Sequence, residues 1–205
     1  MEATSERARA QSRTKDAEPY RRRILNAMAE CIADVGYANT MVADVVRRAK
    51  TSKSKFYAEF GDREACLVAL LSETNDANLA AVAAAVDPTA AWQTQVGQAV
   101  ETWFDWAERR RHLTLTWIRD VPALGPTARS LQRIAMERFV ELVRTLSDTD
   151  ELKSIGIAPV PHARAVLLIG GLRELAAHTV EHDRPLAGVT EEAVRSAIAL
   201  INPSA

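Results

Sequence analysis

The sequence predicts an all-α protein, and three observations support this fold class. Apolar residues recur at intervals of three and four along most of the chain, and no segment shows the strict alternation of a β-strand. Proline, glycine and asparagine or aspartate stand between the periodic segments, where such residues start and stop helices. The 205 residues are 47% hydrophobic, which is enough for a substantial core. We expect about nine helices, divided between a small amino-terminal domain and a larger carboxy-terminal domain.

The amino-terminal part predicts three short helices after a basic arm. Residues 1–18 lack apolar periodicity and predict a flexible arm, either a solvated tail or an extension into a nucleic-acid groove. Pro19 begins the first helix and Gly36 ends it. Asn39 or Thr40 caps a second helix, of about ten residues. This second helix buries one stripe, formed by Val42, Val45, Val46 and Ala49.

A third helix follows Ser52 and completes a helix-turn-helix. Phe56 and Phe60 lie one turn apart on its inner side. Its opposite face is small, polar and cationic, and consists of Lys53, Ser54, Lys55, Tyr57 and Ala58. The second helix of such a motif fits the major groove of DNA. An ordinary solvated face is the alternative, but we expect residues 19–61 to be a DNA-binding domain.

Charge also distinguishes the two ends of the chain. Residues 1–63 carry 13 basic and 9 acidic side chains, a net charge of +4, whereas residues 64–205 carry 13 and 18, a net charge of −5. A basic front end suits a polyanionic partner. The chain has no apolar run typical of a leader or membrane span, so we expect a cytoplasmic protein. Cys31 and Cys66 are too few for a disulfide framework, and buried thiols are favoured over a redox pair.

Residues 62–205 predict the second helical domain. A long helix begins at Asp62 and ends near Val86, because proline at position 88 removes a helix donor. Further helices are expected from about Thr89 to Glu108, His112 to Asp120, His162 to His182, and Thr190 to Ile201. Pro122, Gly125 and Pro126 break the chain, and another helix continues from there to about Leu146. Residues 148–161 predict a loop with a possible helical turn.

The block RRRILNAMAECIADVGYANTMVADVVRRAKTSKSKFYAEFGDREACLVALL, residues 21–71, resembles the DNA-binding domain of TetR-family transcriptional regulators. The matching residues are Ile24-Leu25, Gly36-Tyr37, Thr40, the valine stripe, Ser52, Phe56-Tyr57, Phe60 and Asp62-Arg63-Glu64. The resemblance implies a homodimer on a palindromic DNA operator. It implies base contacts by Lys53 and Ser54, and phosphate contacts by Thr40, Ser52, Lys55, Tyr57 and Arg63. The chain departs from the family at Lys50, where Gly is usual, and at Ser54-Lys55, where Gly-Thr is usual.

The resemblance also implies that the last two helices form a four-helix bundle with a second subunit. Both helices have broad apolar faces. The expected interface consists of Val166, Ile169, Gly170, Leu172, Leu175, Thr179, Val194, Ile198 and Ile201.

The family usually keeps a ligand pocket in the domain between these ends. Aromatic and other large side chains gather there and either fill the core or line an apolar cavity. The candidates are Trp103, Phe104, Trp106, Trp117, Met136 and Phe139, with His178 as a polar neighbour. The run from Arg109 to His112 either stabilises a helix carboxyl end or receives an anionic group of an effector.

These observations predict a DNA-binding transcriptional regulator. The favoured form is a repressor released from a palindromic operator by a small, largely apolar effector. A TetR-like activator and a ligand-independent regulator are the alternatives, and a helical enzyme or protein-interaction module is favoured much less. No nucleophile elbow, phosphate loop, catalytic carboxylate pair or metal-ligand cluster is recognisable. We expect no catalytic residues, no cofactor and no metal, since the pair His178 and His182 lacks a third ligand.

Overall fold

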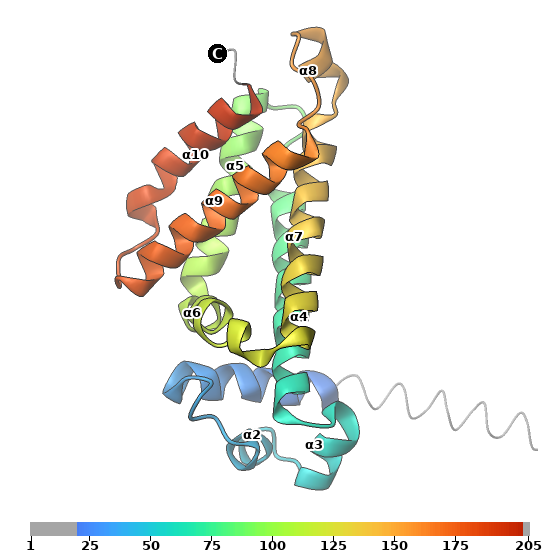
Figure 1. Ribbon diagram of the computed structural model, residues 1–205, viewed down its shortest axis with the longest axis vertical. Helices are drawn as coiled ribbons and strands as arrows, with labels where there is room; N and C mark the ends of the chain where they lie inside the picture. Colours follow the sequence, from blue (N-terminus) through green and yellow to red (C-terminus); the bar gives the residue numbers. More distant parts are fainter. Residues whose placement is uncertain (1–19, 203–205) are drawn as a thin grey trace, which may run out of the picture. The chain divides into compact units, whose positions relative to one another are not determined.

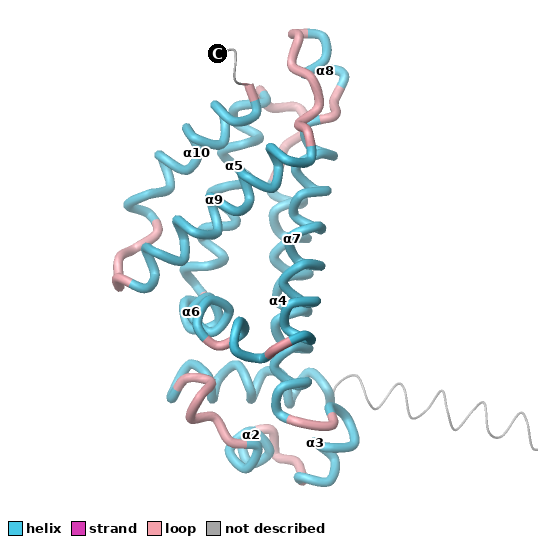
Figure 2. Tube along the Cα trace, in the orientation of Figure 1, coloured by secondary structure: helices cyan, strands magenta, loops and turns pink. Residues whose placement is uncertain are grey.

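The computed structural model describes residues 20–202, and this part of the chain is helical with connecting turns and no strand (Figures 1 and 2). The predicted all-α fold class is confirmed. The chain divides into two compact units, Met1–Leu71 and Ser72–Ala205. Within the described residues there are ten α-helices rather than nine. The additional one is the short α8 (Asp150–Ser154), at the position where the sequence predicts a loop with a helical turn.

The first unit contains a helix over residues 20–35, α2 (Val42–Arg48), α3 (Lys53–Phe60) and the start of α4 (Arg63–Ala85). Gly36 ends the first helix with a φ of 75°, a conformation that glycine adopts without steric cost. The core consists of side chains that are almost completely buried: Ile24, Met28, Ile32, Val45, Phe56, Cys66 and Leu67. Two of these residues belong to α4, so this unit extends past Gly61 to Leu71.

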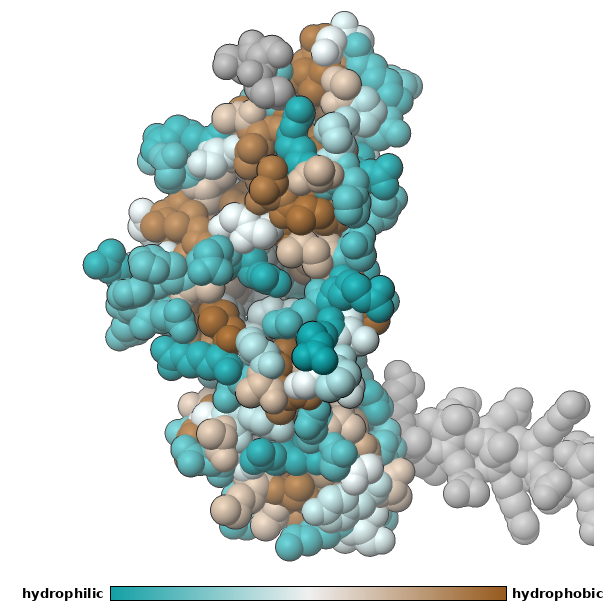
Figure 3. Space-filling view, in the orientation of Figure 1, coloured by the Kyte–Doolittle hydropathy of each residue, from teal (hydrophilic) through white to brown (hydrophobic). Residues whose placement is uncertain are grey.

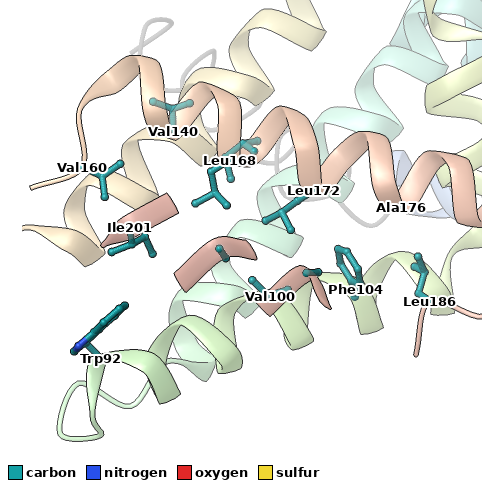
Figure 4. Packing of buried hydrophobic residues seen from close by; sticks show 14 of the residues in the cluster. Trp92, Val100, Phe104, Val140, Val160, Leu168, Leu172, Ala176, Leu186 and Ile201 are labelled. Atoms are coloured by element: carbon teal, nitrogen blue, oxygen red, sulfur yellow. The ribbon is translucent and has the colours of Figure 1, made fainter. Parts of the chain in front are cut away.

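The second unit contains the rest of α4 and seven further elements. They are α5 (Trp92–Arg109), α6 (Arg111–Arg119), the 3₁₀ helix η1 (Val121–Leu124), α7 (Pro126–Ser147), α8, α9 (His162–Glu181) and α10 (Ala187–Ile201). Helix α9 packs against α7 and α10, and α10 packs against α5 (Figure 1). Buried side chains from these helices face one another in a continuous hydrophobic core (Figure 4).

Local chemistry explains where the helices of the second unit begin. Asp87 accepts hydrogen bonds from the amide and the hydroxyl of Thr89, at 2.8 and 2.7 Å. These bonds lower the pKa of Asp87 and hold a turn, so α5 begins at Trp92 rather than at Thr89. Gly125, with a φ of 75°, precedes Pro126 at the first position of α7. Among residues 20–202, no helix has the length and apolar character needed to cross a membrane.

Candidate DNA interface and apolar cavity

Helix α3 has one anchored face and one exposed face. Phe56 is 0% exposed, and its ring centroid lies 5.6 Å from that of Phe60. Lys53, Ser54 and Lys55 are exposed, and Tyr57 is 49% exposed. A helix whose outer face is small and cationic is able to enter a DNA groove closely. This arrangement brings together four of the predicted DNA-contacting residues.

The amino end of α3 carries free donors and cations. The Ser52 hydroxyl accepts a hydrogen bond from the Lys55 amide at 3.3 Å and caps the helix. Within the described residues, neither Lys53 nor Lys55 has a carboxylate partner, whereas Arg47 pairs with Asp44 at 2.7 Å. The ammonium groups of the two lysines are therefore available for phosphate.

The turn before α3 is fixed by Tyr20, a residue that the sequence pattern does not indicate. The Tyr20 hydroxyl lies 2.8 Å from the Thr51 hydroxyl, and the Lys55 ammonium lies 5.7 Å from the centroid of the Tyr20 ring. Lys50 in the same turn has a φ of 51°, at the position where the family usually has glycine. Sequence periodicity could not identify Tyr20, because its partner lies 31 residues away.

Thr40 and Arg63 serve the fold of the first unit. Thr40 is 0% exposed, and its hydroxyl donates to the Gly36 carbonyl at 2.8 Å. The Arg63 guanidinium donates to the Thr40 carbonyl at 2.7 Å and lies 4.4 Å from the centroid of the Tyr37 ring. Burial prevents Thr40 from reaching a phosphate, which corrects the expectation for that residue. Arg63 holds the loop before α2 instead of presenting a free cation.

Both cysteines are buried thiols. Burial raises the pKa of Cys66 to about 12 and also raises the pKa of Cys31. The thiolate is the reactive form, so both side chains behave as small apolar core residues.

The second unit encloses an apolar cavity. The cavity is partly open to solvent, and the centre of a water-sized sphere can reach about 90 Å³ of it. Figure 4 shows Trp92, Val100, Leu168, Leu172 and Ile201 converging on this region from α5, α9 and α10. The remaining lining side chains are Val82, Gln95, Val96, Ala99, Trp103, Phe139, Leu142, Val143, Leu146, Ser147, Leu152, Ile169 and Ala197.

The two polar side chains in the wall are already hydrogen-bonded to backbone. The Gln95 amide donates to the Ala90 carbonyl at 2.8 Å. The Ser147 hydroxyl donates to the Arg144 carbonyl and accepts from the Val160 amide, each at 3.1 Å. The wall therefore offers a ligand mainly apolar contact.

Two of the predicted pocket residues line this cavity. They are Trp103 and Phe139, whose ring centroids lie 5.8 Å apart. Five do not. The expectation is corrected for Phe104, Trp117, Met136 and His178, and the fifth residue, Trp106, lies about one turn beyond Trp103 on α5. Phe104 is a core residue, because it follows Trp103 directly and so points about 100° away around the helix. His178 is exposed on α9, with its ring centroid 4.2 Å from that of His182.

Helical spacing in the sequence could have identified further lining residues of the cavity. Trp92, Val96, Ala99 and Trp103 recur at i, i+4, i+7 and i+11, which places them on one face of α5. A cluster of aromatic residues predicts a cavity lined by large rings. The cavity instead follows this face of α5 and includes small side chains such as Ala99.

The predicted dimer residues fall into two groups. Val166, Gly170, Leu175, Val194 and Ile198 are partly exposed on α9 and α10. Ile169, Leu172, Thr179 and Ile201 are buried within the protomer itself, so they are unavailable to a partner in this conformation, which corrects the expectation for them. Thr179 donates its hydroxyl to the Leu175 carbonyl at 2.7 Å.

The amino-terminal unit decides the family. Residues 24–70, which span the helix-turn-helix, match the family model described as bacterial regulatory proteins, tetR family. This unit is therefore a DNA-binding domain of the TetR family. The TetR family comprises DNA-binding transcription regulators, not enzymes. A search of curated proteins finds no match to the chain.

Solved structures agree with the TetR fold over most of the chain. The fatty acid degradation regulator FadR from Bacillus halodurans has a TM-score of 0.75 at 16% identity and covers 91% of this chain and 96% of its own. FadR from Bacillus subtilis, in complex with stearoyl-CoA, has a TM-score of 0.73 at 15% identity over 88% and 97%. A tetR-family regulator from Streptomyces coelicolor has a TM-score of 0.74 at 14% identity over 89% and 80%. At these identities the likeness concerns the fold.

Proposed function

We propose that this TetR-family protein is a transcriptional repressor that leaves a palindromic operator when a small, largely apolar effector binds. The observation that carries the proposal is the division of α3 into a buried aromatic face and an exposed cationic face. Lys53 and Ser54 then contact base edges, while Ser52, Lys55 and Tyr57 contact phosphates. The protein acts in the cytoplasm, where its DNA partner is found.

The apolar cavity supports the second half of the proposal. A cavity with bonded polar groups and an aromatic and aliphatic wall binds apolar molecules better than polar ones. FadR from Bacillus subtilis, which shares the fold, was solved with stearoyl-CoA. The effector acts only through different affinities for the DNA-competent and DNA-incompetent states of the protein.

A homodimer formed by α9 and α10 supplies the two recognition helices. Leu167 is 67% exposed on α9, and a side chain added at Gly170 or Gly171 would meet no atom within 4 Å. Figure 3 has the orientation of Figure 1, in which α9 lies toward the viewer. On this face, apolar residues interrupt the hydrophilic surface. An open, partly apolar face with two glycines suits close approach of a second helix.

The test is binding of the purified protein to the promoter region beside its own gene. Lys53→Ala and Tyr57→Ala should each weaken binding by about tenfold or more, because each removes a base or phosphate contact. Affinity should fall steeply as salt rises. Lys153→Ala is the matched control, because it removes the same charge from an exposed site in the other unit.

Unchanged affinity in both α3 variants would contradict the proposed DNA interface. The alternative, activation instead of repression, is decided by a reporter gene under the same promoter. Reporter expression rises when a repressor is deleted and falls when an activator is deleted.

A further inference from the structure

The structure separates the basic run at the α5–α6 junction into residues with different partners. Arg109 lies 3.7 Å from the Asp105 carboxylate. Arg111 donates to Glu108 at 3.0 Å, to Asp183 at 3.0 Å and to the Arg184 carbonyl at 2.9 Å. Arg110 has no carboxylate within ion-pair distance among the described residues.

Arg110 stacks on an indole that also lacks a partner. Its guanidinium carbon lies 3.8 Å from the centroid of the Trp106 ring. The Trp106 Nε1–H group is buried and has no hydrogen-bond acceptor in the structure. A buried donor without an acceptor and a partly desolvated cation without a counter-charge are both unfavourable. Burial and the charge of Arg109 accordingly lower the pKa of Arg110.

These two side chains continue the cavity face of α5. The face begins with Trp92, Val96, Ala99 and Trp103, and the same helical spacing leads to Trp106 and Arg110. At 1.5 Å per residue, Arg110 lies about 10 Å along the helix from Trp103. The face is apolar where it lines the cavity and becomes polar toward the end of the helix.

One face of α4 also changes from apolar at the cavity to polar farther along the helix. Val82 lines the cavity, and Asn78 and Asn75 follow on the same face one and two turns toward the amino end. Asn78 is 6% exposed, and its Oδ1 atom has no donor. The Nδ2 atom of Asn75 is also buried without an acceptor. Two helices of the cavity wall thus continue into positions with unmet hydrogen-bonding groups.

We propose that the effector is an apolar chain that ends in an anionic group, with the chain in the cavity and the anion bound by Arg110 and the Trp106 Nε1–H. This inference rests on the proposed function and specifies its ligand class. Carboxylates accept two parallel hydrogen bonds from a guanidinium, so a carboxylate is the favoured anion. Such a ligand supplies the acceptor and the counter-charge that the protein lacks at this point.

Calorimetric titration of the full-length protein tests the inference without DNA. The ligands are decanoate, decyl phosphate, methyl decanoate and decanol, which share the chain and differ in the end group. Decanoate should bind about tenfold or more tightly than the ester and the alcohol, because a charge-assisted bond is lost in both. Tighter binding of decyl phosphate than of decanoate would assign the anion as a phosphate.

Variants locate the anion. Arg110→Met should reduce decanoate affinity by about tenfold or more and leave decanol affinity unchanged. Trp106→Phe keeps the ring under Arg110 and removes the N–H, so it should weaken decanoate in the same selective manner. Arg109→Met is the matched control and should bind decanoate like the unmodified protein. Melting temperatures establish that each variant is folded.

Different results would overturn the proposed anionic end group and the proposed apolar effector. Equal affinity for decanoate, its methyl ester and decanol would overturn the anionic end group but would leave an apolar effector in place. Binding of none of the four would overturn both ligand proposals, while operator binding by α3 is measured separately. Equal loss of decanoate affinity in Arg109→Met and Arg110→Met would overturn the assignment of the anion to Arg110.

Discussion

Lys50 is one of two non-glycine residues with a positive φ within residues 20–202. Its φ of 51° lies in the left-handed region, where an L-residue is disfavoured by about 1–2 kcal/mol. The turn between α2 and α3 requires this conformation, since the Lys50 and Thr51 amides donate to Arg47 and Val46 in a helix-ending pattern. The family usually places glycine here, which adopts this conformation without that steric cost.

Lys50→Gly should therefore raise the free energy of unfolding by about 0.5–1 kcal/mol, after allowing for the greater freedom of glycine in the unfolded chain. Urea denaturation measures this difference. Lys50→Ala is the control, because it removes the charge and keeps the strained conformation. A stability of Lys50→Gly below that of Lys50→Ala would contradict the role assigned to the backbone.

His112 predicts a pH dependence of stability. Burial, followed by the charge of Arg110, lowers the pKa of His112 below its ordinary value of 6.5 in the folded protein. Below pH 6.5 the unfolded chain binds the proton more readily, so stability falls as the pH is lowered toward the folded pKa. Above pH 6.5 the contribution is constant.

His112→Gln should remove this part of the pH dependence. Melting temperatures of both proteins between pH 5 and pH 8 test the prediction, because the other titrating groups are common to both. Parallel curves for the variant and the unmodified protein would show that His112 does not contribute.

Helix boundaries follow closely from the local chemistry of the sequence. Gly36, Ser52 and Pro126 mark element ends where the sequence placed them, because capping and φ restrictions act within one turn. The residues that line the cavity were predicted less well than the helix boundaries. Periodicity identifies the buried face of a helix, but which neighbour that face meets depends on packing between residues far apart in the chain. Trp103 and Phe104 are adjacent, yet only Trp103 lines the cavity.

Arg111 connects three elements of the second unit. It lies at the start of α6, pairs with Glu108 at the end of α5 and donates to Asp183 and the Arg184 carbonyl between α9 and α10. Glu108 also accepts from the Leu186 amide at 2.9 Å. This network is partly buried, so its hydrogen bonds contribute more than those of an exposed pair.

Arg111→Met should lower the free energy of unfolding by about 2 kcal/mol, since it removes charge-assisted bonds and leaves backbone carbonyls unpaired. Arg109→Met, in an exposed i, i+4 pair, should change it by less than about 0.5 kcal/mol. Chemical denaturation compares the two. Equal effects would mean that the network adds nothing beyond an ordinary surface pair.

For the whole molecule, the proposed assembly depends on the outer faces of α9 and α10. Leu167→Glu places a charge where the partner helix is expected and should shift the dimer toward monomers. Sedimentation velocity measures the shift. Ile155→Glu is the matched control, because Ile155 is 55% exposed outside both helices. A dimer unaffected by Leu167→Glu would require a different interface.

The position of the tryptophans has a practical consequence for following this protein in solution. All four indoles belong to α5 and α6, and the unit that carries α3 has none. Three of them mark successive points along one face of α5, from the cavity to Arg110. Intrinsic fluorescence excited at the indole band is thus a label-free signal from the second unit alone, and DNA labelled with a separate dye would report the first unit independently in the same cuvette.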